Sequence, residues 1–336
     1  MIFIQKVLKA LVVGYGSIGK RHIDNLSTFS NMEILVCSNR KYDQFLKEKH
    51  CKLFDSLDDC IKEKPTFAII TNETHLHVKT ALKLAKAGIN LFIEKPLSNS
   101  LNGIKELLNI TNKKKLVTLI GCNFRFHPSI KIIKEIINSG ELGRIISVRV
   151  ENGSFLPNWH PFENYQQTYA AKENLGGGVI LTNIHEIDYL YWFFGNIHEV
   201  YSITGNFSDL DIKADDLSTV LLRFKNNIIA EAHLDYFQQP ATRNCKIIGT
   251  KGTVIWDMSD NIVKYYNIQK NVWTEKLKSS NYDFNMMYLD ELHHFIDCII
   301  KKKKTINCIK EGIYTLKVAL AIKRSSKFKK AQIVDR

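Results

Sequence analysis

The first third of the chain alternates short apolar runs with longer segments whose apolar residues repeat at helical spacing. The apolar runs, typical of buried strands, occupy residues 10–13, 33–37, 66–70, 90–93 and 116–120. The segments between them predict helices at 41–50, 55–63, 78–87 and 101–112. Because strands that alternate with helices form parallel sheets, this pattern predicts an α/β protein with a doubly wound parallel sheet.

Beyond residue 121 the pattern changes to a helix followed by a series of strands. The helix is expected at 129–139, the strands at 145–151, 218–224, 228–236, 245–248 and 253–257, and two closing helices at 285–300 and 309–325. Short turns between several of these strands favour antiparallel pairing. In 228–236, apolar residues alternate with others, which indicates one face covered by helices and one left for a partner subunit.

Two domains follow from these patterns. Residues 1–122 are expected to form a Rossmann domain. Residues 123–336 are expected to form an α+β domain with a large, mostly antiparallel open sheet, whose last helix is free to pack back on the first domain.

A glycine-rich turn stands between the first strand and the first helix. Gly14, Gly16 and Gly19 have the G-x-G-x-x-G spacing. The first glycine permits a tight turn, the second lets the backbone approach a pyrophosphate, and the third lets the helix pack closely on the strand. With Ser17 and Ile18, whose N–H groups open the helix, these residues predict a dinucleotide site.

The end of the second predicted strand bears on the choice of cofactor. An acidic residue there would bind the ribose 2′-hydroxyl of NAD, but the chain has Ser38, Asn39 and Arg40. Arg40 is able to pair with a 2′-phosphate, so NADP(H) is favoured over NAD(H). The alternative is that Arg40 is only a solvated loop charge.

The composition of the chain bears on its location and on the presence of membrane segments, metal sites and disulfides. The chain has 336 residues, 45% of them hydrophobic, and none of its apolar stretches is long enough to span a bilayer. Residues 1–13 are expected to be a short tail and the first strand rather than a signal peptide. The seven cysteines form no C-x-x-C pair, so we expect no metal site, no disulfide framework and a cytoplasmic location.

The net charge of +13 is the one feature that suggests nucleic acid. The lysine runs at 113–115, 301–304 and 327–330 each follow a predicted helix, where cations complement the helix dipole. No nucleic-acid motif accompanies them, so we expect neither a nucleic-acid nor a membrane partner.

Several motifs in order resemble the Gfo/Idh/MocA family, the glucose-fructose oxidoreductase and inositol dehydrogenase group. They are GYGSIGKRH at 14–22, TNETH at 71–75, EKPLS at 94–98, RFHP at 125–128 and GGGVILTNIHEIDYL at 176–190. The resemblance covers essentially the whole chain and implies hydride transfer between a nicotinamide and a sugar or polyol carbon. The stretch WHPFENY at 159–165 also looks like family members associated with bacterial surface sugars.

The resemblance implies two catalytic positions. Lys95 matches the family's catalytic lysine, whose ammonium can stabilise an alkoxide and pass a proton, with Glu94 to orient it and a cis bond expected before Pro96. The alternative is a solvated loop lysine. His185 matches a histidine that serves, with a preceding aspartate, as a proton relay; the alternative is a core or capping histidine. Here Thr182 stands where that aspartate is expected, which puts ordinary alcohol oxidation in doubt, and Asp188 is a candidate substitute.

Further positions follow from the same resemblance. Thr71, Asn72 and His75 are expected beside the nicotinamide, although the family's proline after Thr71 is absent. Asn123 and Arg125 are expected to contact substrate or cofactor, with an interdomain salt bridge as the alternative for Arg125. A loop with Trp159, His160, Tyr165 and Tyr169 is a candidate substrate lid or an oligomer contact.

Three functions remain open on the sequence. The first is an NAD(P)-dependent oxidoreductase acting on a sugar or nucleotide sugar, as a homodimer or homotetramer formed through the open sheet. The second keeps the cofactor bound and uses a transient oxidation for epimerisation, elimination or hydrolysis. The third is a regulatory binding protein that has kept the nucleotide site and lost turnover.

Overall fold

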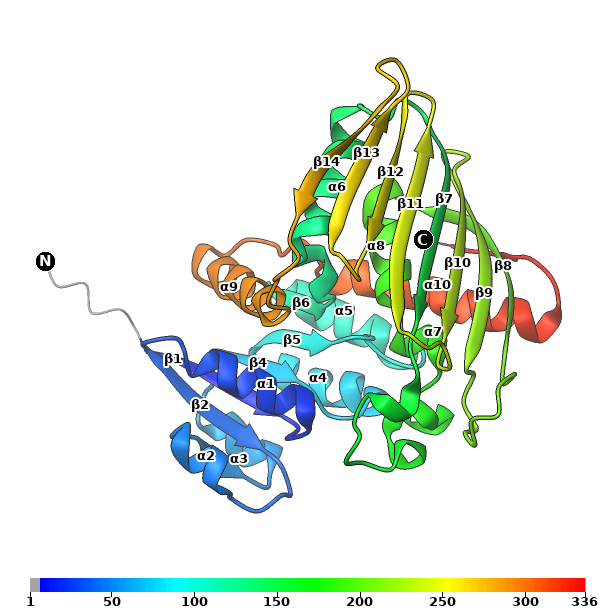
Figure 1. Ribbon diagram of the computed structural model, residues 1–336. Helices are drawn as coiled ribbons and strands as arrows, with labels where there is room; N and C mark the ends of the chain where they lie inside the picture. The colour runs from blue at the N-terminus through cyan, green and yellow to red at the C-terminus, as the bar shows by residue number, and fades with distance from the viewer. Residues whose placement is uncertain (1–6, 336) are drawn as a thin grey trace, which may run out of the picture. The chain divides into compact units, whose positions relative to one another are not determined.

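The computed structural model describes residues 7–335 and divides the chain into two compact units (Figure 1). The first unit ends at Gly121 and also takes in Tyr288–Ile313. The second unit contains Cys122–Met287 and the chain from Tyr314 onward. The expected tail falls mostly on residues 1–6, outside the described residues.

The first unit is built on a six-stranded sheet, and the prediction that its strands are parallel is confirmed. Its strands are β1 (Leu8–Val13), β2 (Met32–Cys37), β3 (Lys52–Phe54), β4 (Phe67–Ile70), β5 (Asn90–Glu94) and β6 (Thr118–Gly121), in the order β3-β2-β1-β4-β5-β6. The helices are α1 (Ser17–Leu26), α2 (Gln44–Glu48), α3 (Leu57–Lys62), α4 (His77–Lys86) and α5 (Ile104–Lys113). Strand order reverses between β1 and β4, the place where such sheets bind ligands.

Two local details differ from the predicted pattern. Strand β3 has only three residues, too few for an apolar run to stand out, and no strand was expected there. Helix α2 is shorter than the predicted 41–50 because Asp43 caps its start, while His50, just beyond its end, has a left-handed φ of 51°.

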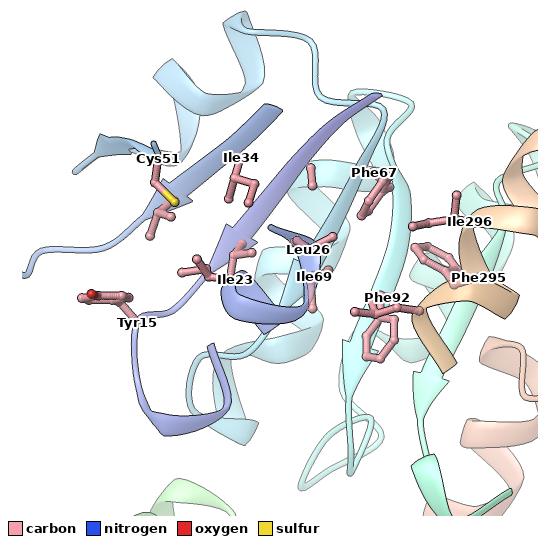
Figure 2. Close-up of a cluster of buried hydrophobic side chains, with 14 of the residues drawn as sticks. Tyr15, Ile23, Leu26, Ile34, Cys51, Phe67, Ile69, Phe92, Phe295 and Ile296 are labelled. Carbon is pink, nitrogen blue, oxygen red and sulfur yellow. The ribbon is translucent and has the colours of Figure 1, made fainter. Parts of the chain in front are cut away.

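Helix α9 (Asn285–Lys301) completes the core of the first unit. Figure 2 shows Phe295 and Ile296 beside the core residues Phe67 and Phe92. The chain after α9 then follows β6, where Asn307 O accepts from Ile120 N at 2.8 Å. Residues 288–313 therefore belong to the first unit, which differs from the expected division at residues 122 and 123.

The second unit contains a nine-stranded sheet in the order β14-β13-β12-β11-β7-β10-β9-β8-β15. The strands are β7 (Ile145–Gly153), β8 (Ile197–Gly205), β9 (Leu217–Phe224), β10 (Ile229–Asp235), β11 (Thr242–Gly249), β12 (Gly252–Asp257), β13 (Ile262–Asn267), β14 (Val272–Lys278) and β15 (Gln332–Ile333). Among the described strands only β7 and β10 pair in parallel, so the prediction of a mostly antiparallel sheet is confirmed.

Helices cover one face of this sheet. Helices α6 (Pro128–Ser139), α7 (Val179–Thr182) and α8 (His185–Phe194) contact it, and Figure 1 shows α6 and α8 behind the strands. The last helix, α10 (Ile309–Phe328), carries the chain from the first unit into the second. Along β10, Ala230, Ala232 and Leu234 are buried while Ile229 is 43% exposed, as the alternation predicted.

The other face keeps exposed apolar side chains on adjacent strands. They are Tyr201 and Ile203 on β8, Leu221 on β9 and Ile229 on β10. A homodimer or homotetramer through this face stays a prediction, which the mass of the protein in solution would test. Within residues 7–335, no helix combines the length and the apolar character needed to cross a membrane.

Candidate active site

The three glycines of the loop differ in how much space surrounds them. A Cβ at Gly14, whose φ is 106°, would lie 2.7 Å from Asn72 N, and one at Gly19 would lie 2.3 Å from Gly14 O, so neither position tolerates a side chain. A Cβ on Gly16, the N-cap of α1, would meet no atom within 4 Å. The loop is therefore tight at its two ends and open at the helix N-terminus, where the backbone N–H groups suit an anion.

Thr71 joins the end of β4 to this loop. Its hydroxyl donates to Val13 O and Gly14 O, each at 3.0 Å. The Thr71 side chain thus fixes the loop conformation from the neighbouring strand.

His77, rather than His75, is the histidine built into this edge of the sheet. His75 is exposed, whereas His77 is buried between two backbone carbonyls, Asn72 O and Pro96 O, each 2.9 Å from a ring nitrogen. Burial lowers the pKa of His77, while the two carbonyl acceptors oppose this shift, because only a protonated ring donates to both. The one signal for His77 in the sequence is its place as the second histidine of T-H-L-H, which by itself indicates no role.

Glu94 anchors the backbone that carries Lys95. Its carboxylate is buried at the end of β5, with Oε1 2.7 Å from His22 Nε2 and Oε2 accepting from Lys95 N at 3.1 Å. The Lys95–Pro96 peptide is cis, as the resemblance led us to expect. His22, the last residue of the GYGSIGKRH motif, had no predicted role, yet it holds the carboxylate that positions the loop of Lys95.

The segment where the adenosine ribose is expected carries an accessible cation. Ser38 Oγ accepts from Arg40 N at 3.1 Å, and Asn39 and Arg40 are exposed. Within residues 7–335, no carboxylate lies within salt-bridge distance of the Arg40 guanidinium.

In the second unit, Thr182 and His185 lie on two consecutive helices rather than on one. Helix α7 ends at Thr182 and α8 begins at His185. The start of α7 is fastened by Asp215, whose main-chain O accepts from Val179 N at 2.8 Å and whose Oδ2 accepts from Ile180 N at 3.3 Å. The break between the helices lets the two side chains be oriented separately.

Tyr236 connects the Thr182 position to the predicted lid. The Tyr236 hydroxyl interacts with Thr182, and its ring meets the Trp159 ring edge-on at 5.3 Å. Trp159 Nε1 in turn donates to Ser154 Oγ at 2.9 Å. Burial raises the pKa of Tyr236 well above its usual value, so the hydroxyl keeps its proton. Tyr236 lies 54 residues beyond Thr182, so no local sequence pattern links the two residues.

Arg125, one of the predicted substrate or cofactor residues, is paired with a carboxylate. Its guanidinium is buried and forms a bidentate ion pair with Asp188, with Nε to Oδ2 at 2.7 Å and Nη2 to Oδ1 at 2.8 Å. The pair lies within the second unit and uses both carboxylate oxygens, which leaves Asp188 unsuited to replace the missing relay aspartate.

Glu186, next to His185, forms an ion pair with a second arginine. Its Oε1 lies 2.9 Å from Arg243 Nε, and the Arg243 guanidinium lies 4.1 Å from the Phe124 ring centroid. The Phe124 ring is 5.0 Å from the His185 ring. Two arginine pairs therefore hold the first turn of α8, and with it His185.

The predicted lid presents aromatic and polar groups. His160 is exposed, Trp159 and Tyr165 are half-buried, and Tyr169 is 39% exposed.

Asn123 is fully buried, and its Oδ1 has no hydrogen-bond partner among the described residues. In the same residues, no group of three His, Cys, Asp or Glu side chains could hold a metal ion.

A parallel sheet with this glycine loop at its strand-order reversal defines a dinucleotide-binding protein. Residues 8–122 match the oxidoreductase family with an NAD-binding Rossmann fold, and residues 130–255 match the GFO/IDH/MocA C-terminal domain. The chain belongs to the Gfo/Idh/MocA family and is an oxidoreductase.

Relatives extend along most of the chain. The myo-inositol 2-dehydrogenase of Thermotoga maritima is 25% identical over 337 residues, covering 95% of this chain and 96% of that protein. The 2,7-anhydro-N-acetylneuraminate hydratase of Mediterraneibacter gnavus is 25% identical over 226 residues, covering 64% and 57%. The structure of levoglucosan dehydrogenase with NADH covers 98% of this chain and 99% of its own, with a TM-score of 0.88 at 16% identity, which shows the shared fold.

Proposed function

We propose that this oxidoreductase transfers a hydride between a nicotinamide cofactor and a CH–OH carbon of a sugar or nucleotide sugar. The observation that carries the proposal is the placement of Lys95 directly after β5, on a backbone fixed by the buried Glu94 carboxylate. In open parallel sheets, ligands bind outside the carboxyl ends of the strands. The cofactor would bind along Gly14–Gly19 and supply the hydride chemistry.

Lys95 and His185 are proposed to handle the proton. In the oxidation of the alcohol, a neutral Lys95 amine accepts the hydroxyl proton as the hydride leaves the carbon and the carbonyl forms. In the reverse direction, the Lys95 ammonium stabilises the alkoxide that forms when the hydride reaches the carbonyl carbon, and then protonates it. His185 is proposed to pass a proton to or from the sugar. The aromatic residues around Trp159 are proposed to stack on the sugar ring, and Asn123 to hydrogen-bond its hydroxyls.

The relatives support a sugar substrate, since they include enzymes named for myo-inositol and levoglucosan. Within that class we propose a sugar of bacterial surface polysaccharides, on the resemblance of residues 159–165. A screen of keto-sugars and nucleotide sugars, followed by NAD(P)H absorbance, tests the proposal. Absence of turnover with every sugar, together with tight nucleotide binding, would favour the regulatory alternative.

A transient-redox reaction is the second candidate. One relative is named a hydratase, and a hydratase adds or removes water without a net oxidation. Thr182 in place of the family aspartate also favours altered chemistry. Nucleotide that co-purifies and does not exchange, with product formed but no net NAD(P)H, would identify this second function.

The relay hypothesis predicts that Thr182→Asp raises kcat by about ten-fold and shifts its pH profile, because a carboxylate there would orient His185 and raise its basicity. The matched variant is Thr182→Asn, which introduces a similar volume without a charge. Circular dichroism verifies folding, since Thr182 is 3% exposed. If both variants matched the wild type in rate and pH profile, Thr182 would not occupy the relay position.

NADP(H) is proposed in preference to NAD(H), on the strength of the exposed Arg40. Arg40→Ala is expected to weaken NADPH binding about ten-fold through loss of a charged hydrogen bond, and to leave NADH binding within about two-fold. Titration followed by nucleotide fluorescence measures both. Lys105→Ala removes an exposed cation on α5 as the control. An equal effect of Arg40→Ala on the two nucleotides would contradict 2′-phosphate recognition.

A further inference from the structure

The segment between β2 and α2, residues 38–43, is fastened to the glycine loop at both ends. At its start, Gly14 N donates to Cys37 O at 3.0 Å. At its end, the Tyr15 hydroxyl donates to Asp43 Oδ1 at 2.7 Å. Asp43 also caps α2, because Oδ1 accepts from Leu46 N at 3.1 Å. The residues expected at the adenosine ribose are therefore held in a closed loop against the expected phosphate site.

Three groups contact the Asp43 carboxylate. Besides the Tyr15 hydroxyl and the Leu46 N–H, Lys20 Nζ lies 3.6 Å from Oδ2. The same ammonium lies 4.7 Å from the centroid of the Tyr15 ring. The hydrogen bond from Tyr15 lowers the pKa of Asp43, so the carboxylate is ionised at neutral pH.

Tyr15 gives this charge a fixed position. Its side chain is 4% exposed and belongs to the apolar cluster of the first unit drawn in Figure 2. Because the Tyr15 ring is buried in that cluster, its hydroxyl has a fixed position. The hydrogen bond from this hydroxyl therefore fixes the position of the Asp43 carboxylate. The Asp43 side chain remains 41% exposed, so solvent and salt screen its charge.

We infer that Asp43 is a specificity-determining residue of the nucleotide site and that it opposes Arg40. The inference rests on the proposed function, because it assumes that the ribose lies against residues 38–43. Arg40 attracts a 2′-phosphate, whereas the Asp43 carboxylate repels it and also holds the Lys20 ammonium. The choice between NADPH and NADH is then set by the balance of two charges on one loop, only one of which stands at the usual sequence position.

The test is Asp43→Asn in the full-length chain, stripped of nucleotide and titrated with NADPH and NADH. Asparagine keeps an oxygen for the Leu46 N–H and the Tyr15 hydroxyl but removes the charge and releases Lys20. The Kd for NADPH is expected to fall about five- to ten-fold, with that for NADH changing by less than about two-fold. The gain should shrink at high ionic strength, since charge effects at an exposed site are screened.

Two further variants separate charge from structure. Tyr15→Phe keeps the charge and removes the tether, and it is expected to weaken both nucleotides by a similar factor. Glu106→Gln removes an exposed carboxylate on α5 and should change neither Kd. An Asp43→Asn effect equal for both nucleotides, or independent of salt, would overturn the inference. If the wild-type chain bound neither nucleotide, the proposed function would fail as well.

Discussion

Replacing Lys95 with alanine is expected to abolish turnover while the nucleotide remains bound. General acid–base groups contribute roughly 10²- to 10⁴-fold to rate, so kcat should fall by about three orders of magnitude. Nucleotide affinity should stay within about three-fold, because Gly14, Gly16 and Gly19 form the expected phosphate site without the Lys95 side chain. Steady-state rates and fluorescence titration on the same preparation provide both numbers.

The chain offers a matched control for this variant. Lys79 is an exposed lysine on α4, in the same unit, and none of the described residues forms an ion pair with it. Lys79→Ala should therefore turn over at the wild-type rate. Near-normal turnover of the Lys95 variant would remove Lys95 from the mechanism, and loss of nucleotide binding in parallel with turnover would show a structural effect instead.

The nucleotide loop could be predicted because its signals are local. An apolar strand, three glycines and a following helix fall within a single stretch of sequence, and the structure shows that Gly14 and Gly19 have no room for a side chain. The strands of the second unit were harder. Strand β14 is almost entirely exposed, so its residues have no reason to be apolar, and the pattern that marks a buried strand is absent.

The contacts that hold the site could not be predicted, since they join residues far apart in the chain. Glu94 and His22 are separated by 72 positions and Arg125 and Asp188 by 63. Hydrophobic periodicity reports which face of an element is buried, but it does not specify the partner of a buried polar group. The same limit applies to His77, because the sequence does not indicate that its ring lies between the carbonyls of Asn72 and Pro96.

The Arg125–Asp188 pair leads to the largest expected effect on stability. Both side chains are buried, at 1% and 2% exposure, and Thr315 Oγ1 lies a further 3.4 Å from Asp188 Oδ1. Arg125→Met would leave the carboxylate buried without its counter-charge, which costs about 3–5 kcal/mol in measured cases. The free energy of unfolding of the second unit should fall by that amount.

Tryptophan fluorescence is suited to this measurement. All four tryptophans of the chain, Trp159, Trp192, Trp256 and Trp273, lie in the second unit, and the Arg125 guanidinium is 5.7 Å from the Trp192 ring centroid. Urea unfolding followed at this signal therefore reports on the unit that contains the pair, whatever the first unit does.

The double variant Arg125→Met with Asp188→Leu decides between a structural and a substrate-binding arginine. Replacing both partners with apolar groups removes the uncompensated charge, so the double variant should be more stable than Arg125→Met alone. A substrate-binding Arg125 predicts the opposite pattern, with KM raised and the unfolding midpoint unchanged in the single variant. Asp188 lies in the first turn of α8, which begins at His185. A loss of stability accompanied by a lower kcat would therefore indicate that the Arg125–Asp188 pair orients His185.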